Sequence, residues 1–109
     1  VVYGGLAAIV LPTRRSQCRI VIETLYVRSA YRGIYKPAVW LLLLRHLVHQ
    51  VELEAMSVSL WSFGAGLRSN PLMRPVFQHL GCATDDVSVP HSRFLASVFA
   101  PSGGGCDVN

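Results

Sequence analysis

The hydrophobic pattern of the first quarter of the chain predicts two β-strands. Residues 1–12 and 18–27 are rich in β-branched and small apolar side chains, and the first run ends at Pro12. A short polar segment, residues 13–17, separates the two runs and carries two arginines. Apolar runs joined in this way are typical of a β-hairpin. The sequence therefore predicts a hairpin with a basic connection.

The next part of the chain predicts a long amphipathic helix. Pro37 follows a basic loop at residues 28–36. Proline suits the first turn of a helix, because its φ is fixed and its missing N–H is not needed there. Beyond it, apolar residues recur at the i, i+3, i+4, i+7 and i+11 positions of one helical face. We expect a helix that starts at Pro37 and buries Trp40, Leu43, Leu44, Leu47 and Val51.

A third strand is expected directly after this helix. Residues 55–61 alternate small polar with apolar side chains. Since almost no linker separates this run from the helix, the strand–helix–strand order predicts a crossover to a parallel neighbour. The chain is therefore expected to contain a βαβ unit after the hairpin.

The last third of the chain predicts a short helix and two further strands. Ser69 or Asn70 can cap the helix, and Pro75 either kinks it or marks its true start. Residues 82–89 and 92–99 are interpreted as a final pair of strands. The fold class that follows is α+β, with the order of the strands left open.

The composition indicates one folded domain. Hydrophobic residues make up 51% of the chain and charged residues 15%, which excludes a disordered chain. Such apolarity predicts a sheet that is covered on both faces, or a surface that meets a partner. The longest apolar run, residues 38–44, falls well short of the ~20 residues of a membrane span. We expect a single domain at residues 1–100, a flexible tail at 101–109 and no membrane contact.

Positive charge is concentrated in the first part of the chain. The net charge is +4, and seven of the ten Lys and Arg residues lie in the first 45 positions. This clustering predicts a polyanion nearby, either cofactor phosphates or nucleic acid. Nucleic-acid binding through Arg14, Arg15 and Arg19 is not favoured over a solvated hairpin connection, because no aromatic residues are interleaved with these arginines.

The cysteines and histidines do not predict a metal site. The three cysteines form no CxxC pair and leave one over in any disulfide scheme, which favours a reducing compartment such as the cytoplasm. His46 and His49 are three apart on the predicted helix and could chelate a metal, but no matching ligand pair follows. A solvated helix face is the favoured interpretation of these two histidines.

Three segments, in this order, resemble the GNAT acetyltransferase family. Residues 22–27, IETLYV, resemble the family's central strand ending before the cofactor loop, and residues 31–41, YRGIYKPAVWL, resemble its pyrophosphate loop. Residues 70–82, NPLMRPVFQHLGC, are similar to its asparagine, aromatic and Gly-Phe segment. The likeness implies a GNAT-like mixed central sheet with a long helix after the cofactor loop and a short C-terminal helix. It lacks the family's N-terminal strand and first two helices.

The resemblance implies acetyl-CoA as cofactor and an amine as acceptor. Backbone N–H groups at a helix N-terminus, together with the helix dipole, can solvate a pyrophosphate, and an arginine adds a charge-assisted donor. The family pattern implies that the amide of Val27 holds the acetyl carbonyl, and that Glu23 is the candidate general base. Glu23 could equally be a strand-end carboxylate facing an arginine. The implied cofactor-binding residues are Tyr26, Val27, Arg32, Gly33, Ile34, Tyr35, Lys36 and Asn70.

Two departures from the family pattern leave a second function open. The small residues of the phosphate loop fall on Tyr35 and on Pro37, which has no N–H to offer. Phe77 stands where the family often has a tyrosine that protonates the thiolate leaving group. The chain is therefore expected to be either an acetyl-CoA-dependent N-acetyltransferase or a non-catalytic GNAT-like assembly module. The partners of such a module would be other protein chains, for example in a phage virion.

Overall fold

The computed structural model of the chain describes residues 4–13, 16–31, 39–82 and 88–100. Its strands are β1 (Gly4–Pro12), β2 (Cys18–Val27), β3 (Val58–Phe63) and β4 (Val89–Pro90). Its α-helices are α1 (Val39–Leu53), α2 (Ala65–Arg68), α3 (Arg74–Leu80) and α4 (His91–Val98), with 3₁₀ turns at η1 (Ser29–Tyr31) and η2 (Pro71–Met73).

The four strands form one mixed sheet in the order β1-β2-β3-β4. β1 and β2 are antiparallel and form the predicted hairpin. β2 and β3 are parallel, with α1 as the crossover between them, so the predicted βαβ unit is confirmed. β3 and β4 pair antiparallel. The fold class is therefore α+β with a mixed sheet, as expected.

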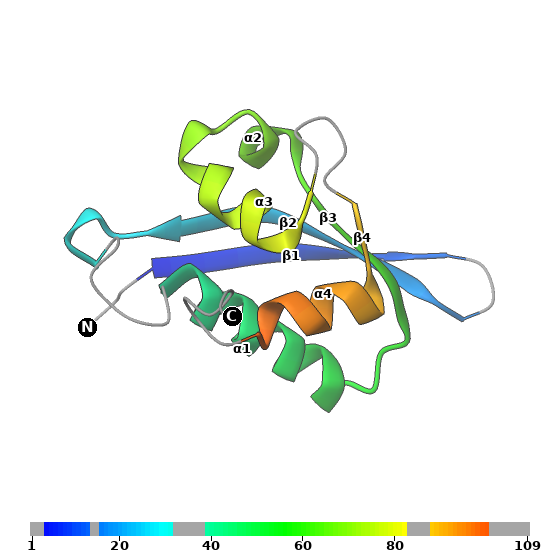
Figure 1. Cartoon of the computed structure of the whole chain (residues 1–109). Coiled ribbons are helices and arrows are strands. Elements are labelled where there is room, and N and C mark those ends of the chain that lie inside the picture. Colours follow the sequence, from blue (N-terminus) through cyan, green and yellow to red (C-terminus); the bar gives the residue numbers. More distant parts are fainter. Residues whose placement is uncertain (1–3, 14–15, 32–38, 83–87, 101–109) are drawn as a thin grey trace.

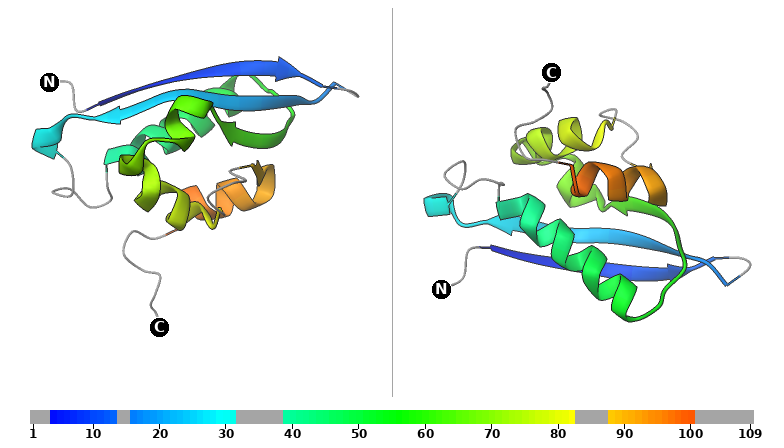
Figure 2. Two further views of the ribbon diagram at one scale, coloured as in Figure 1. Left: turned by 90° about the horizontal axis from the view of Figure 1, so that it is seen from above. Right: turned by 60° about the horizontal axis from the view of Figure 1, so that its bottom comes forward.

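The helices lie on one face of this sheet (Figures 1 and 2). Alternate residues of the central strands point to that face and are buried, among them Ile20, Ile22, Trp61 and Phe63. The described residues on the opposite face are half-buried or exposed. The expectation of a sheet covered on both faces is therefore not met within the described ranges.

Aromatic stacking joins the sheet to the C-terminal helices. The Trp61 ring on β3 stacks on the Phe94 ring of α4 with centroids 4.1 Å apart and planes 5° from parallel. Phe63, two residues further along β3, meets Phe77 of α3 edge to face at 5.1 Å. Trp61 and Phe94 are fully buried, so these contacts form the centre of the core.

The buried face of α1 differs from the predicted one. Leu44 and Val51 are buried as expected, whereas Trp40, Leu43 and Leu47 are only half-buried. The stripe in contact with the core is Val39, Leu41, Leu44, Val48 and Val51. The four consecutive leucines 41–44 carry no periodicity of their own, so the pattern could not assign which of them faces the sheet.

The prediction of a strand at residues 92–99 is wrong. This segment forms α4. The other expected strand, residues 82–89, lies mostly outside the described residues, and within them the last strand is Val89–Pro90. Phe94 and Val98, four residues apart, are fully buried on the same side of the helix. That helical spacing buries more of the segment against Trp61 than a strand would, since a strand would turn its alternate residues outward.

The short helix before α4 begins in one of the two ways expected. Asn70 is the cap, and its side-chain Oδ1 accepts a hydrogen bond from the Leu72 N–H at 3.0 Å. Residues 71–73 form the turn η2, and Pro75 then occupies the first turn of α3. The missing N–H of Pro75 therefore falls where no intrahelical bond is needed.

Among the described residues, none of the helices has both the length and the apolar character that crossing a membrane requires.

Replacing Phe94 with Ala should destabilise the protein far more than replacing Phe99, which follows the same helix. Phe94 is 0% exposed and Phe99 is 53% exposed. Removing a buried ring leaves a cavity, so we expect Phe94→Ala to lower the free energy of unfolding by about 3–5 kcal/mol. Phe99→Ala should cost less than about 1 kcal/mol. Urea denaturation followed by tryptophan fluorescence measures both, and equal losses would contradict the assigned core.

Candidate functional site

β2 and β3 separate part of the way along β2. Their parallel pairing runs from Cys18 opposite Val58 to Ile22 opposite Phe63. The N–H of Gly64 donates the last bond of the ladder, to the Ile22 carbonyl at 2.8 Å. β3 ends there and the chain turns into α2, whereas β2 continues to Val27. Residues 23–27 of β2 thus have no described strand beside them on the β3 side.

A β-bulge lies at this point of separation. Opposite β2, Ala8 pairs with Ile22 and Ala7 pairs with Thr24, so Glu23 is the extra residue. The burial of β2 records the same shift, because Ile22 and then Leu25 are buried, three residues apart rather than two. The bulge shifts by one residue the alternation of buried and exposed side chains along β2, at the point where β3 ends.

Glu23, the candidate general base, lies on β2 next to the point where β3 ends and the chain turns into α2, a helix that contacts β2. It is the first residue of β2 past the paired segment, and its side chain is exposed. Its carboxylate lies directly beside the α-carbon of Gly64, at the junction of β3 with α2. The structure therefore places Glu23 between the two diverging elements, and no arginine pairing of its carboxylate is described.

Tyr26 and Val27 form the last part of β2, opposite the two glycines of β1. Val27 pairs with Gly4 and Tyr26 with Gly5. A Cβ on Gly5 would come within 2.6 Å of the Tyr26 ring, so this ring covers the glycine on the face of the sheet that carries no described helix. A side chain at position 5 would therefore require the Tyr26 ring to move.

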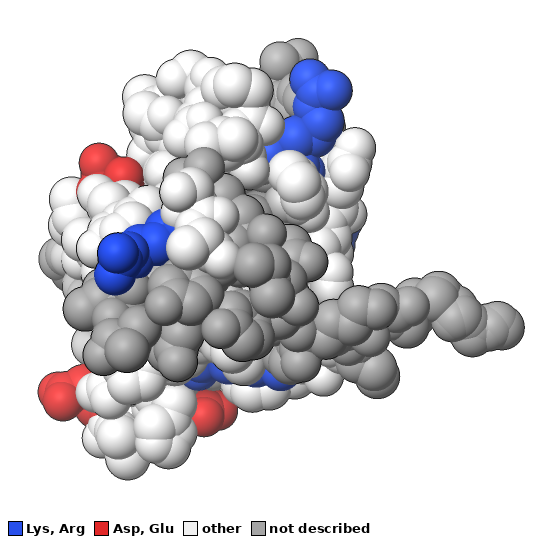
Figure 3. Space-filling model, turned by 90° about the vertical axis from the view of Figure 1, so that its left-hand side faces the viewer, with Lys and Arg blue, Asp and Glu red and all other residues white. Residues whose placement is uncertain are grey.

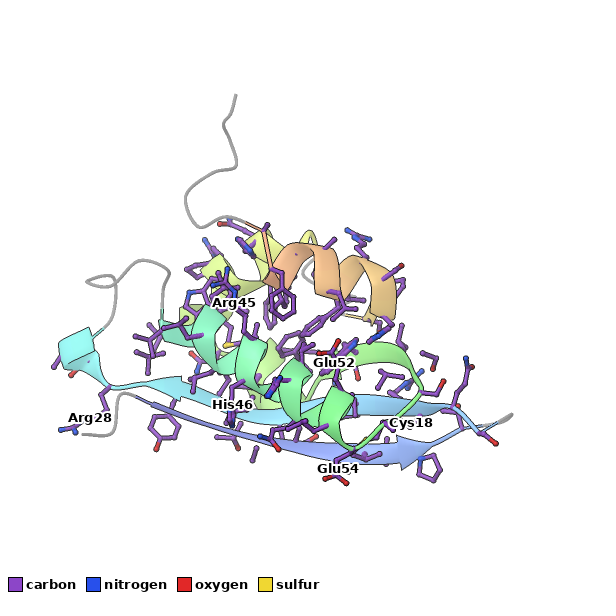
Figure 4. The ribbon with its side chains drawn as sticks, turned by 90° about the horizontal axis from the view of Figure 1, so that it is seen from below. Cys18, Arg28, Arg45, His46, Glu52 and Glu54 are labelled. Carbon is purple, nitrogen blue, oxygen red and sulfur yellow. The ribbon has the colours of Figure 1, made fainter. Side chains whose placement is uncertain are left out.

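The predicted phosphate loop lies outside the described residues. This applies to Arg32, Gly33, Ile34, Tyr35 and Lys36, and to Pro37 as the predicted start of the helix. Its two neighbours are described: η1 follows β2, and α1 begins at Val39. Figure 4 shows Arg28 at the end of β2 that is remote from Cys18, which is the end that leads into the loop.

Asn70 and Phe77 have structural roles in the described contacts. The Asn70 side chain caps η2, as described above, and it is half-buried. Phe77 packs against Phe63 in the core. The structure brings Glu23, Tyr26 and Val27 together on one strand, but no described contact connects Asn70 with them.

Two arginines, Arg45 and Arg93, donate hydrogen bonds to backbone carbonyls at the C-terminal ends of helices. On the side of α1 that faces α4, Arg45 donates from Nε to the Val98 carbonyl at 2.8 Å and from Nη2 to the Ala100 carbonyl at 3.1 Å (Figure 4). Arg93 donates to the Gly81 carbonyl at 2.6 Å, just after α3. These arginines stabilise helix C-termini and do not contribute to a basic surface at the end of β2.

The surface beside the end of β2 carries scattered charge. In Figure 3, which faces this side, the described arginines lie at separate places and form no single cluster. None of the polar or charged side chains in the described ranges is fully buried. The described residues therefore supply no continuous basic patch of the kind that binds nucleic acid.

The histidines and cysteines do not gather into a metal site within the described ranges. His46 and His49 are exposed on α1, whereas His79 contacts the Ser97 carbonyl through Nε2 at 2.7 Å. His91 accepts a hydrogen bond at Nδ1 from the Trp61 indole N–H at 3.0 Å. Each of the last two rings therefore has a structural partner.

The sequence did not reveal the role of Gly64. Gly64 is distinguished by its contact with Glu23, which is 41 residues away in the chain. This contact arises only when β2 and β3 pair, so no local sequence pattern could predict it.

No family model, no curated protein and no solved structure matches this chain.

Replacing Asn70 separates its capping role from a role in ligand binding. Asn70→Ala should lower the free energy of unfolding by about 1 kcal/mol, because the Leu72 N–H loses its acceptor. Asn70→Asp keeps a capping oxygen and should change stability by less than about 0.5 kcal/mol. Thermal denaturation measures both variants. A loss as large in the Asp variant as in the Ala variant would contradict the capping role.

Proposed function

We propose that the chain is a GNAT-type N-acetyltransferase domain that transfers the acetyl group of acetyl-CoA to an amine. The observation that carries the proposal is the parting of β2 from β3 at a bulge, in the strand that precedes the long helix α1 along the chain. An opening between two parallel strands can receive an extended thioester arm. The ordered sequence likeness to the family points to the same place in the chain.

The backbone of β2 past the bulge supports this site. Cys18 donates its N–H to Ser57, and Ile22 accepts from Gly64, so even-numbered residues before the bulge face β3. Because Glu23 is one inserted residue, the peptide groups that face the β3 side beyond it are those of odd-numbered residues. By this alternation, the peptide group of Leu25 is directed toward the side from which β3 departs.

The proposed chemistry is acyl transfer by positioning and proton removal. Glu23, directly or through a water molecule, takes a proton from the substrate ammonium group. The lone pair of the neutral amine forms a bond to the thioester carbonyl carbon, and the carbon–sulfur bond breaks. The second amine proton passes through water to the CoA thiolate, because Phe77 has no proton to give. The products are an N-acetyl amide and CoA.

The phosphates of the cofactor would lie against the loop of residues 32–36 and the start of α1. Arg32 and Lys36 supply positive charge in that loop, and the N-terminus of a 15-residue helix follows it. Glu52, in the last turn of α1, and Glu54, directly after the helix, lie at the opposite end (Figure 4). The charges along α1 are thus arranged favourably for an anion at its start.

Acetyl-CoA should bind to the isolated chain and perturb the amides of β2 beyond the bulge. Isothermal titration with acetyl-CoA should give measurable heat, and ¹⁵N-labelled protein should show the largest shifts at residues 23–28. Desulfo-CoA, which keeps the nucleotide and the pantetheine arm but lacks the sulfur, tests whether binding depends on the thioester. No heat at millimolar acetyl-CoA, with no amide shifts, would overturn the proposal.

A non-catalytic assembly module is the second candidate, and the outer edge of β1 favours it. β1 is the terminal strand of the described sheet and contains no charged residue. Ile9, Val10 and Leu11 are between 43% and 48% exposed. A long, uncharged, apolar edge strand readily pairs with a strand from another chain. Such pairing would continue the sheet across two chains.

If the chain assembles through this edge, sedimentation should show species larger than a monomer that Val10→Lys returns to the monomer. A lysine on an edge strand opposes strand pairing because its charge would be buried in the contact. Leu72→Lys, at a position that is 61% exposed on η2, is the matched control and should leave the assembly intact. A monomer at all concentrations would exclude self-assembly through β1.

A further inference from the structure

Gly64 is a glycine whose backbone does not require glycine. Its φ is −67° and its ψ is 162°, an extended conformation that any residue adopts. The residue is buried, and its N–H is fixed to the Ile22 carbonyl by the last hydrogen bond of the β2–β3 ladder. The reason for a glycine must therefore lie in what occupies the space above its α-carbon.

That space is filled by the carboxyl group of Glu23. A Cβ on Gly64 would lie 2.8 Å from Glu23 Oε2, and 2.9 Å from both Oε1 and Cδ. All three atoms are closer than a carbon atom can approach, so the carboxylate lies across the glycine. Because the Ile22 carbonyl adjoins Glu23 in the chain, the same hydrogen bond holds the glycine and the bulge in register.

We propose that Gly64 is the positioning residue for Glu23, because its missing side chain leaves room for the Glu23 carboxylate at the point where β3 parts from β2. The inference rests on the proposed acetyl transfer and adds a specific residue to it. Gly64 does not touch the substrate. Its missing side chain lets the Glu23 carboxylate settle against the end of β3, beside the position in which the amine must lose its proton.

Alanine at position 64 displaces the base without changing the backbone. The added methyl group requires the carboxylate to move by about 1 Å, and a misplacement of this size can cost on the order of 10²-fold in rate. We expect Gly64→Ala to lower kcat/KM for the amine about 10- to 100-fold while acetyl-CoA still binds as in the wild type. The loss should appear in kcat, because the acyl donor site is unchanged.

Gly66→Ala is the matched control. Gly66 lies two residues further along, in α2, and a Cβ there would meet nothing within 4 Å. Both variants add one methyl group to the same short segment. The control should keep the wild-type rate, so a difference between the two alanines isolates the contact with Glu23.

Combining Gly64→Ala with Glu23→Gln tests whether the glycine acts through the carboxylate. Glutamine has nearly the same shape and cannot accept the proton, so Glu23→Gln alone should be slow. If Gly64 acts only by placing Glu23, the double variant should be no slower than Glu23→Gln. Fully multiplicative losses in the double variant would overturn the positioning role.

Two readouts that do not depend on turnover complete the experiment. The ¹³C chemical shift of the Glu23 carboxyl carbon should change in Gly64→Ala and not in Gly66→Ala. If Gly64→Ala does not fold, adding Glu23→Asp should restore folding, since the shorter side chain makes room for the methyl group. A folded Gly64→Ala with an unchanged carboxyl signal would overturn the inference.

The outcomes separate this inference from the proposed function. If the wild type acetylates amines and the two alanine variants have equal rates, the role of Gly64 is wrong and the proposed function stands. If the wild type neither binds acetyl-CoA nor transfers acetyl groups, both proposals fail.

Discussion

The parallel pairing of β2 with β3 is the contact on which both the core and the candidate site depend. It places Ile20 opposite Trp61 and Ile22 opposite Phe63, so their side chains form one apolar surface for the helices. It also ends abruptly, at the hydrogen bond between Gly64 and Ile22. The pairing that builds the core therefore also defines where the sheet opens, since β2 continues beyond the point where β3 stops.

Much of the fold could be predicted from local patterns. Apolar runs separated by polar residues predicted the hairpin, and the strand–helix–strand order predicted a parallel crossover. These features depend on periodicities within short stretches of chain. The buried face of α1 was predicted wrongly, because the consecutive leucines 41–44 are compatible with several buried faces of the helix. The strand predicted at residues 92–99 was wrong because, taken alone, these residues have a composition that also suits a strand. The helix is favoured by the contact of Phe94 with Trp61, which the local sequence does not show.

The candidate site was accessible to sequence reasoning only in part. Glu23, Tyr26 and Val27 were predicted as site residues because they stand in one continuous segment that resembles a known family. The bulge that separates Glu23 from its neighbours depends on the register with β1, which no local pattern encodes. Gly64 meets Glu23 only through a long-range strand pairing, so its role could not be inferred before the two strands were placed together.

The two candidate functions draw on different parts of the same sheet. Acyl transfer uses the side of β2 from which β3 departs, whereas assembly would use the outer edge of β1, on the other side of β2. The case for assembly rests on a strand edge without charged residues and on the exposure of Ile9, Val10 and Leu11. These features are also found in strands that are covered by neighbouring parts of the same chain. The opening combines a bulge, a strand end and a carboxylate held against a glycine that the backbone does not need. We therefore prefer acyl transfer as the proposal, because it uses the bulge, the strand end and the carboxylate together, whereas assembly through β1 uses none of them.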